Sequence, residues 1–195
     1  VALTQGTASD FFMAVYFSAY DINYSDVEII SMSPPDLIQA IQNGDIDVMF
    51  NWQPNIQNVM ESLGDNAYSL PGDGMKPMEW LLVTRRDFAE NNPEQLVKFL
   101  RAMERAENFI ATDQGSAISL HAAEIGLEEA VLATLWQEIV WRLTLDEALL
   151  INLENQARWA VDNEKVGNDE IPNFYELIFF DALEAVNPNA ITILR

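Results

Sequence analysis

Residues 4–12, with the sequence TQGTASDFF, bring a glycine turn and a helix start together directly after a short apolar run. Thr7 suits the N-cap of that helix, and Asp10 stands three residues later, where it would complete a Thr-x-x-Asp capping box. The backbone N–H groups at such a helix start, together with the positive end of the helix dipole, also suit a sulfonate, carboxylate or phosphate oxygen. The residues alone therefore leave two interpretations open, a plain helix cap and an anion site.

Polar residues follow two further apolar runs. Asn51, Trp52 and Gln53 come directly after one run, and Ser33 comes after another. In open α/β sheets ligands bind at the carboxyl ends of the strands, so loops in these places should meet at one edge of the sheet. Trp52 would be either an apolar wall of a binding site or a packing residue, while Asn51 and Gln53 would supply donors or acceptors. Ser33 is a weaker candidate of the same kind.

The elements that must position these residues alternate along the first part of the chain, which predicts βαβ units and a mainly parallel sheet. The predicted strands are residues 1–3, 27–31, 46–50 and 79–84, and the predicted helices are 9–20, 35–43 and 54–63. After Arg85 the pattern becomes helical, with an apolar stripe from Pro93 onward and further helices predicted over 127–143 and 146–163. We therefore predict an α/β ligand-binding lobe over residues 1–84 and a mainly helical region over 85–195.

The composition excludes several classes of function. The 195 residues include 31 acidic and 10 basic side chains, for a net charge of -21, which repels nucleic acid and anionic lipid. The chain has no cysteine, and His121 is its only histidine, so a metal site or a histidine-dependent catalytic triad has little to work with. We expect no metal, no cofactor and no nucleic-acid partner.

Several stretches taken together resemble one family, the solute-binding proteins of ABC importers for sulfonates, taurine and nitrate, which are related to thiamine-pyrimidine-binding proteins. The stretches are TQGTASDFF, SPPDLIQAIQNGDIDVMFNWQP, LLVTRRDFAENNPEQLVKFLRAMERAENFI, ALLINLENQARWAVDN and FYELIFFDALEAVNPNAITIL. The resemblance implies an α/β fold of the type II periplasmic-binding-protein kind, in which two lobes close on a ligand in the cleft between them. This chain then looks like the second lobe followed by helices that return toward a first lobe, because nothing that resembles the first lobe precedes Val1. Either that lobe has been removed or the chain is a shortened relative.

The resemblance also implies a set of ligand-binding residues. In the family the Gly-Thr loop faces the cleft, which points to Gly6, Thr7 and Ala8, with Ser9 adjacent. The family has a Trp and an acidic residue in the Trp-x-Pro position, where this sequence has Gln53 beside Trp52. Glu79 lies where the family's chain heads back between the lobes. With the loop residues described above, the implied site comprises Gly6, Thr7, Ala8, Ser9, Ser33, Asn51, Trp52, Gln53 and Glu79.

The function expected from the resemblance is binding, without catalysis, of a small anionic or zwitterionic solute for an ABC permease, in the periplasm or outside the cell. A sensor module and a pyrimidine-binding protein remain alternatives, and a homodimer could form through surface left by the missing lobe. Enzymatic relatives that make a thiamine pyrimidine carry a Cys-rich motif, which is absent here. Charge favours a zwitterion, because the only basic residue before Arg85 is Lys76. Thr7 would meet its oxyanion, and Glu79 or Asp47 its ammonium.

Overall fold

A computed structural model describes residues 1–70, 72 and 79–194, and Lys76 lies outside the described residues. The contacts divide the chain into two compact units. The first comprises Val1–Glu79 and Arg158–Glu170, and the second comprises Trp80–Ala157 and Ile171–Arg195. The first unit thus includes a late segment from outside residues 1–84.

The first unit is built on a small parallel sheet. Strand β1 (Ala2–Leu3) pairs in parallel with β2 (Ile30–Ser31), with Ala2 opposite Ile30, and a parallel bridge joins Ala2 to Met49 on its other side. Strand β1 is therefore central. Because its two residues point to opposite faces, Leu3 and Ala2 enter two different apolar clusters. The predicted parallel arrangement is confirmed, although the regular pairing is shorter than the apolar runs.

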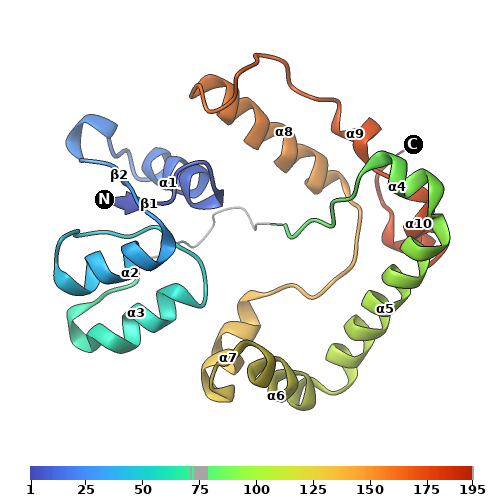
Figure 1. The fold of residues 1–195 in the computed structure, drawn as a ribbon, viewed down its shortest axis with the longest axis horizontal. Coiled ribbons are helices and arrows are strands. Elements are labelled where there is room, and N and C mark those ends of the chain that lie inside the picture. The colour runs from blue at the N-terminus through green and yellow to red at the C-terminus, as the bar shows by residue number, and fades with distance from the viewer. Residues whose placement is uncertain (71, 73–78, 195) are drawn as a thin grey trace. The chain divides into compact units, whose positions relative to one another are not determined.

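Helices cover both faces of this sheet. Helix α1 (Ala8–Ala19) packs Met13, Tyr16 and Phe17 against Leu3 and Phe50. Helix α2 (Pro34–Asn43) packs on the other face through Leu37, which has no exposed surface, and α3 (Asn55–Leu63) lies beside α2 (Figure 1). All three helices begin and end within two residues of the predicted bounds. A parallel sheet covered on both faces is the doubly wound arrangement that the alternating pattern predicts.

The second unit is helical. Its helices are α4 (Arg86–Asn91), α5 (Pro93–Thr112), α6 (Gln114–Ile125), α7 (Glu129–Leu135), α9 (Phe174–Leu177) and α10 (Phe180–Glu184), together with the first part of α8 (Glu147–Asp162). Helix α5 contacts α4, α6 and α10, and a parallel bridge from Leu145 to Ile191 holds the C-terminal segment. The predicted helices from Pro93 and over 146–163 are confirmed.

Two predicted elements of this region are wrong. Residues 79–84 form no strand, because they have no partner strand among the described residues, and Trp80 is 96% exposed. The predicted helix over 127–143 is too long, since α7 ends at Leu135 and a 3-10 turn follows. Residues 136 and 141 would lie on different sides of a continuous helix, whereas the Trp136 and Trp141 rings are 4.5 Å apart in the structure. Their contact therefore requires the chain to leave the helix.

The apolar stripe of α5, which includes Phe99 and Met103, is partly exposed. None of the helix's residues is buried, and Phe99 and Met103 are 50% and 40% exposed. We expect the chain to self-associate through this face, because exposed apolar patches of this kind commonly form interfaces. Sedimentation should show a mass that rises with concentration, and Phe99→Ser combined with Met103→Ser should abolish the rise, while Arg101→Ser should leave it unchanged. A wild-type chain that stays monomeric at high concentration would contradict this prediction.

Candidate functional site

Three loops follow the carboxyl ends of the parallel strands, at one edge of the sheet, as the sequence predicts. The loop of residues 4–7 follows β1, Met32 and Ser33 follow β2, and residues 51–53 follow the strand-like segment that reaches Phe50. The first two loops are bonded to each other, because the Thr4 hydroxyl donates to the Met32 carbonyl at 2.8 Å. The Gln5 N–H also donates to the Ser31 hydroxyl at 3.4 Å. The edge thus presents polar residues from separate parts of the first unit.

Gly6 gives the first loop its shape. Its φ of 72° lies in the left-handed region, where a Cβ is strained even though no atom lies within 4 Å of the place a Cβ would take. In this conformation its N–H points to Asp10, whose Oδ2 accepts the hydrogen bond at 3.0 Å. The Gly6 N–H is therefore satisfied within the protein.

Thr7 is the N-cap of α1, but the predicted capping box does not form as expected. The Thr7 hydroxyl accepts from the Ser9 N–H at 3.3 Å and donates to the Thr4 carbonyl at 2.6 Å. Asp10 turns away from the Thr7 N–H that a capping box would use, because its carboxylate binds Gly6. The hydroxyl is thus engaged in shaping the loop, and a ligand would meet the Thr7 backbone.

The open donors of the loop are two consecutive backbone N–H groups. In the described part of the chain, the N–H groups of Thr7 and Ala8 have no hydrogen-bond acceptor. They lie at the start of a helix of 12 residues, where N–H groups have no intrahelical partner and the helix dipole is positive. Ala8 is exposed, whereas Ser9 is 5% exposed and offers a ligand little surface. The arrangement can hold an oxyanion through the Thr7 and Ala8 amides.

The loop after Phe50 carries the aromatic candidate. Trp52 is 41% exposed, so its ring can contact a ligand. The Asn51 side-chain oxygen accepts from the Trp52 N–H at 2.9 Å and from the Asn55 amide at 3.1 Å. The Gln53 side-chain oxygen accepts from the Gln57 N–H at 3.2 Å and so caps the first turn of α3. These two amides hold the loop in place.

The remaining candidates lie in different settings. The Ser33 hydroxyl donates to Asp36 at 2.5 Å, and Glu79 is half-buried in the first unit. Asp47 cannot serve the carboxyl edge as expected, since it precedes the Val48 carbonyl that accepts from the Ala2 N–H. It therefore lies toward the amino end of its segment, at the opposite edge of the sheet.

Lys165 places a positive charge next to the first loop, and the sequence did not predict it. Lys165 Nζ is 2.9 Å from Asp10 Oδ2, the same oxygen that accepts the Gly6 N–H. The Asp10 side chain is 3% exposed and that of Lys165 is 31% exposed. Lys165 belongs to the late segment of the first unit. Its separation of 155 positions from Asp10 left no local pattern by which the pair could be recognised.

The charges of this pair extend to Tyr24. Burial raises the pKa of Tyr24 above its ordinary value, the negative charge of Asp10 raises it further, and the positive charge of Lys165 opposes the rise. The Tyr24 ring also packs edge-on against Phe17 of α1, with the ring centroids 5.2 Å apart. The charges of the ion pair therefore act beyond the first turn of α1.

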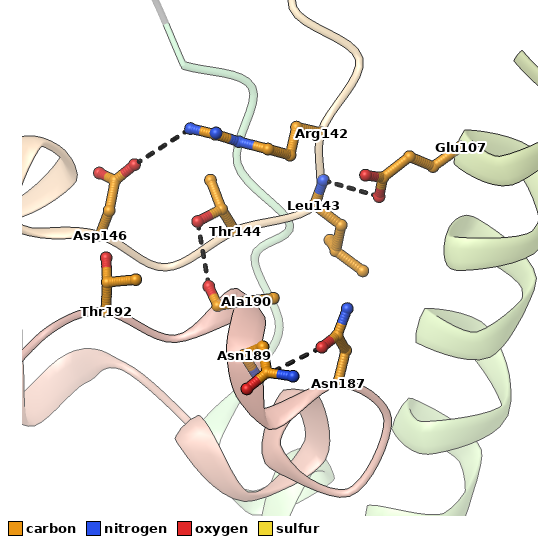
Figure 2. Close-up of a pocket in the computed structure, with 9 residues that line it drawn as sticks. All are labelled: Glu107, Arg142, Leu143, Thr144, Asp146, Asn187, Asn189, Ala190 and Thr192. Atoms are coloured by element: carbon orange, nitrogen blue, oxygen red, sulfur yellow. Dashed lines mark hydrogen bonds and ion pairs between the residues drawn. The ribbon is translucent and has the colours of Figure 1, made fainter. Parts of the chain in front are cut away.

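The second unit contains a polar pocket of about 360 Å³ that none of the predicted site residues lines. Figure 2 shows Glu107 reaching from α5 to the Leu143 N–H, at 3.1 Å, and Arg142 pointing toward Asp146, at 3.8 Å. The Thr144 hydroxyl donates to the Ala190 carbonyl at 3.0 Å. Because these polar groups already bind one another, we interpret the pocket as a structural junction that holds the C-terminal segment in place.

In the part of the chain that the structure describes, His, Asp and Glu side chains nowhere gather in a group of three that could ligate a metal ion. Within residues 1–70 and 79–194, no helix combines the length and apolar character that crossing a bilayer requires. His121 is half-buried on α6, with its ring centroid 5.8 Å and 5.7 Å from those of Trp136 and Trp141. The His121 ring therefore packs against the two indole rings.

Comparison with known proteins gives the family. The sequence model of the NMT1/THI5-like family matches residues 1–117, which include the sheet, α1 and the three loops. The chain belongs to this family. Over 95 residues it is 34% identical to the taurine-binding periplasmic protein of Escherichia coli (strain K12), a match that covers 47% of this chain and 29% of that protein. Over 140 residues it is 22% identical to a protein of Brucella abortus (strain 2308) named as a candidate binding protein, covering 69% of this chain and 43% of that one.

A solved structure confirms the fold expected for this NMT1/THI5-like chain. The periplasmic aliphatic sulphonate binding protein SsuA from Escherichia coli superposes with a TM-score of 0.63 at 17% identity, over 86% of this chain and 58% of that one. The chain thus has the α/β fold of periplasmic binding proteins. It spans less than two thirds of the length of each of these relatives.

Proposed function

We propose that this chain is the ligand-binding part of an ABC importer for a small anionic or zwitterionic solute of the sulfonate, taurine or nitrate class. The observation that carries the proposal is the pair of open N–H groups of Thr7 and Ala8 at the carboxyl edge of a parallel sheet. The names of the taurine-binding and sulphonate-binding relatives support the same ligand class. Ligand binding would then take place in the periplasm or outside the cell, with a permease as partner and without catalysis.

The discrete donors should contribute most of the recognition. A hydrogen bond to a charged group contributes about 1.5 to 3 kcal/mol, whereas a helix dipole contributes about 0.3 to 1 kcal/mol. The Trp52 ring would cover the apolar part of the solute, and the Glu79 carboxylate would meet an ammonium group. The interlobe cleft expected for the family remains a prediction.

A second candidate is a pyrimidine or thiamine precursor stacked on Trp52. The observation that favours it is the exposure of the Trp52 ring beside Asn51, whose side-chain amide can form a hydrogen bond with a heterocycle. In this case the ligand would need no oxyanion site. A sensor module with the same ligand would share the site and differ only in the partner.

Calorimetric titration of the chain with sulfonates, nitrate, amino acids and pyrimidines should separate these candidates. Ala8 is the first residue of α1 and follows an extended Thr7, so Ala8→Pro removes its N–H at a position where proline fits a helix. This variant should weaken sulfonate binding by roughly 10- to 150-fold. The control Ala8→Ser keeps the N–H and should bind as the wild type does. If only neutral heterocycles bind, with Ala8→Pro harmless and Trp52→Ala abolishing the binding, the oxyanion proposal fails.

A further inference from the structure

The carboxylate of Asp10 places a buried negative charge beside the proposed anion site, and the structure shows how this charge is compensated. Asp10 lies in the first turn of α1, only two residues beyond Ala8, and its side chain is 3% exposed. A buried charge without a partner is costly, and a negative one beside the loop would repel an oxyanion. The Asp10 Oδ2 is shared by the Gly6 N–H at 3.0 Å and Lys165 Nζ at 2.9 Å. The carboxylate is thus both bonded and neutralised.

Lys165 is placed by a specific turn at the end of α8. The Lys165 N–H donates to the Ala160 carbonyl at 2.8 Å, and the Glu164 N–H donates to the Val161 carbonyl at 3.0 Å. Glu164 has a φ of 53°, in the left-handed region. Together these features form a Schellman motif, which reverses the chain after the helix. Lys165 is thereby brought back over the Trp159 ring, with Nζ 5.8 Å from its centroid.

A second contact joins the same two segments. The Trp159 ring lies edge-on to Phe11, with the centroids 5.4 Å apart, and Phe11 is the neighbour of Asp10. The end of α8 is therefore attached to the start of α1 by one aromatic contact and one ion pair. Because this unit carries 15 acidic and only three basic side chains, a cation at this place matters for any anion that approaches.

We propose that Lys165 is a positioning residue of the anion site, which neutralises Asp10 and holds its carboxylate on the Gly6 N–H so that Thr7 and Ala8 can receive an oxyanion. This inference rests on the proposed function. It assigns Lys165 a role through Asp10, without a contact to the ligand. The residue thereby determines whether the loop accepts an anion.

A double-mutant comparison tests this role, with taurine and methanesulfonate as probes and affinities measured by calorimetry and NMR titration. Lys165→Met should weaken binding by roughly 10- to 100-fold, because it leaves an uncompensated carboxylate beside the site. Lys165→Arg should restore affinity to within about threefold of the wild type. Asp10→Asn combined with Lys165→Met removes both charges and should also bind within about threefold of the wild type. Arg158→Met, which removes another cation of the same unit, should change the affinity less than about twofold.

The inference would be overturned if Lys165→Met bound the probes as the wild type does. It would also be overturned if the double variant bound as weakly as Lys165→Met, or if Arg158→Met lost as much affinity as Lys165→Met. A double variant that stays weak would show that Lys165 contacts the ligand itself. If the wild type binds neither probe, the proposed function fails, and hydrogen exchange of the Gly6 amide still tests the positioning. Lys165→Met should speed that exchange at least about tenfold, and Lys165→Arg should not, since only the first releases Asp10 from its place. An unchanged Gly6 exchange rate in Lys165→Met would then reject the inference.

Discussion

Replacing Leu37 with Ala should lower the free energy of unfolding of the first unit by about 2 to 5 kcal/mol. Leu37 has no exposed surface and fills the cluster between α2 and the sheet, with Ala2, Ala40 and Ile46. Its truncation removes buried apolar contacts and leaves a cavity that small neighbours such as Ala2 and Ala40 cannot fill. Hydrogen exchange of the Ala2 and Phe50 amides reports this unit, because both amides bond across the sheet.

A matched control separates burial from residue type. Leu70 belongs to the same unit and is 49% exposed. Leu70→Ala should therefore change the free energy of opening, derived from the same exchange rates, by less than about 0.5 kcal/mol. Equal losses in the two variants would show that Leu37 does not lie in a packed core. The placement of α2 on the sheet would then be wrong.

Lys165→Met should lower the free energy of unfolding by about 2 to 4 kcal/mol, and Asp10→Asn should lower it less. The asymmetry follows from burial. Removing Lys165 strands a carboxylate that is 3% exposed, whereas removing the charge of Asp10 leaves a lysine that is 31% exposed and can turn to water. The expected loss for Lys165→Met begins as low as about 2 kcal/mol because Lys165 is partly exposed, so that water already screens part of the ion pair.

Urea denaturation of the two single variants and the double variant measures this asymmetry. The double variant should be more stable than Lys165→Met, because no charge is then left buried. A larger loss for Asp10→Asn than for Lys165→Met would contradict the account. It would mean that the lysine, and not the carboxylate, is the group that depends on its partner.

The sequence predicted the part of the fold that local patterns encode. Alternating apolar runs and helix caps were enough for the parallel sheet, α1, α2 and α3, and for the meeting of three loops at one edge. Residues 79–84 have the composition of a strand, but strand formation depends on a neighbouring strand, and the described residues supply no strand beside them. The helix over 127–143 was extended too far because helical periodicity does not reveal that the Trp136 and Trp141 rings contact each other.

The sequence predicted the positions of the loops that carry the candidate residues, but it did not predict the ion pair between Asp10 and Lys165. Gly6 and Thr7 are recognisable from local chemistry, since one supplies a left-handed turn and the other a cap. The partner of Asp10 is not, because Lys165 reaches it from a distant segment through the turn that ends α8. The sequence does show a lysine shortly after a predicted helix end, in a segment where acidic residues dominate, but that position does not identify Asp10 as its partner.

The central claim is that the amides at the start of α1 bind a small oxyanion, and mapping of amide shifts tests it most directly. The ¹⁵N-labelled chain would be titrated with taurine, and the backbone shifts followed by NMR. The largest shifts should occur at Thr7 and Ala8, with smaller ones in the loop that carries Trp52. Ala8→Pro has no N–H at position 8 and should suppress the shift at Thr7. Shifts centred on Arg142 and Glu107 in the second unit, or no saturable shift at the start of α1, would contradict it.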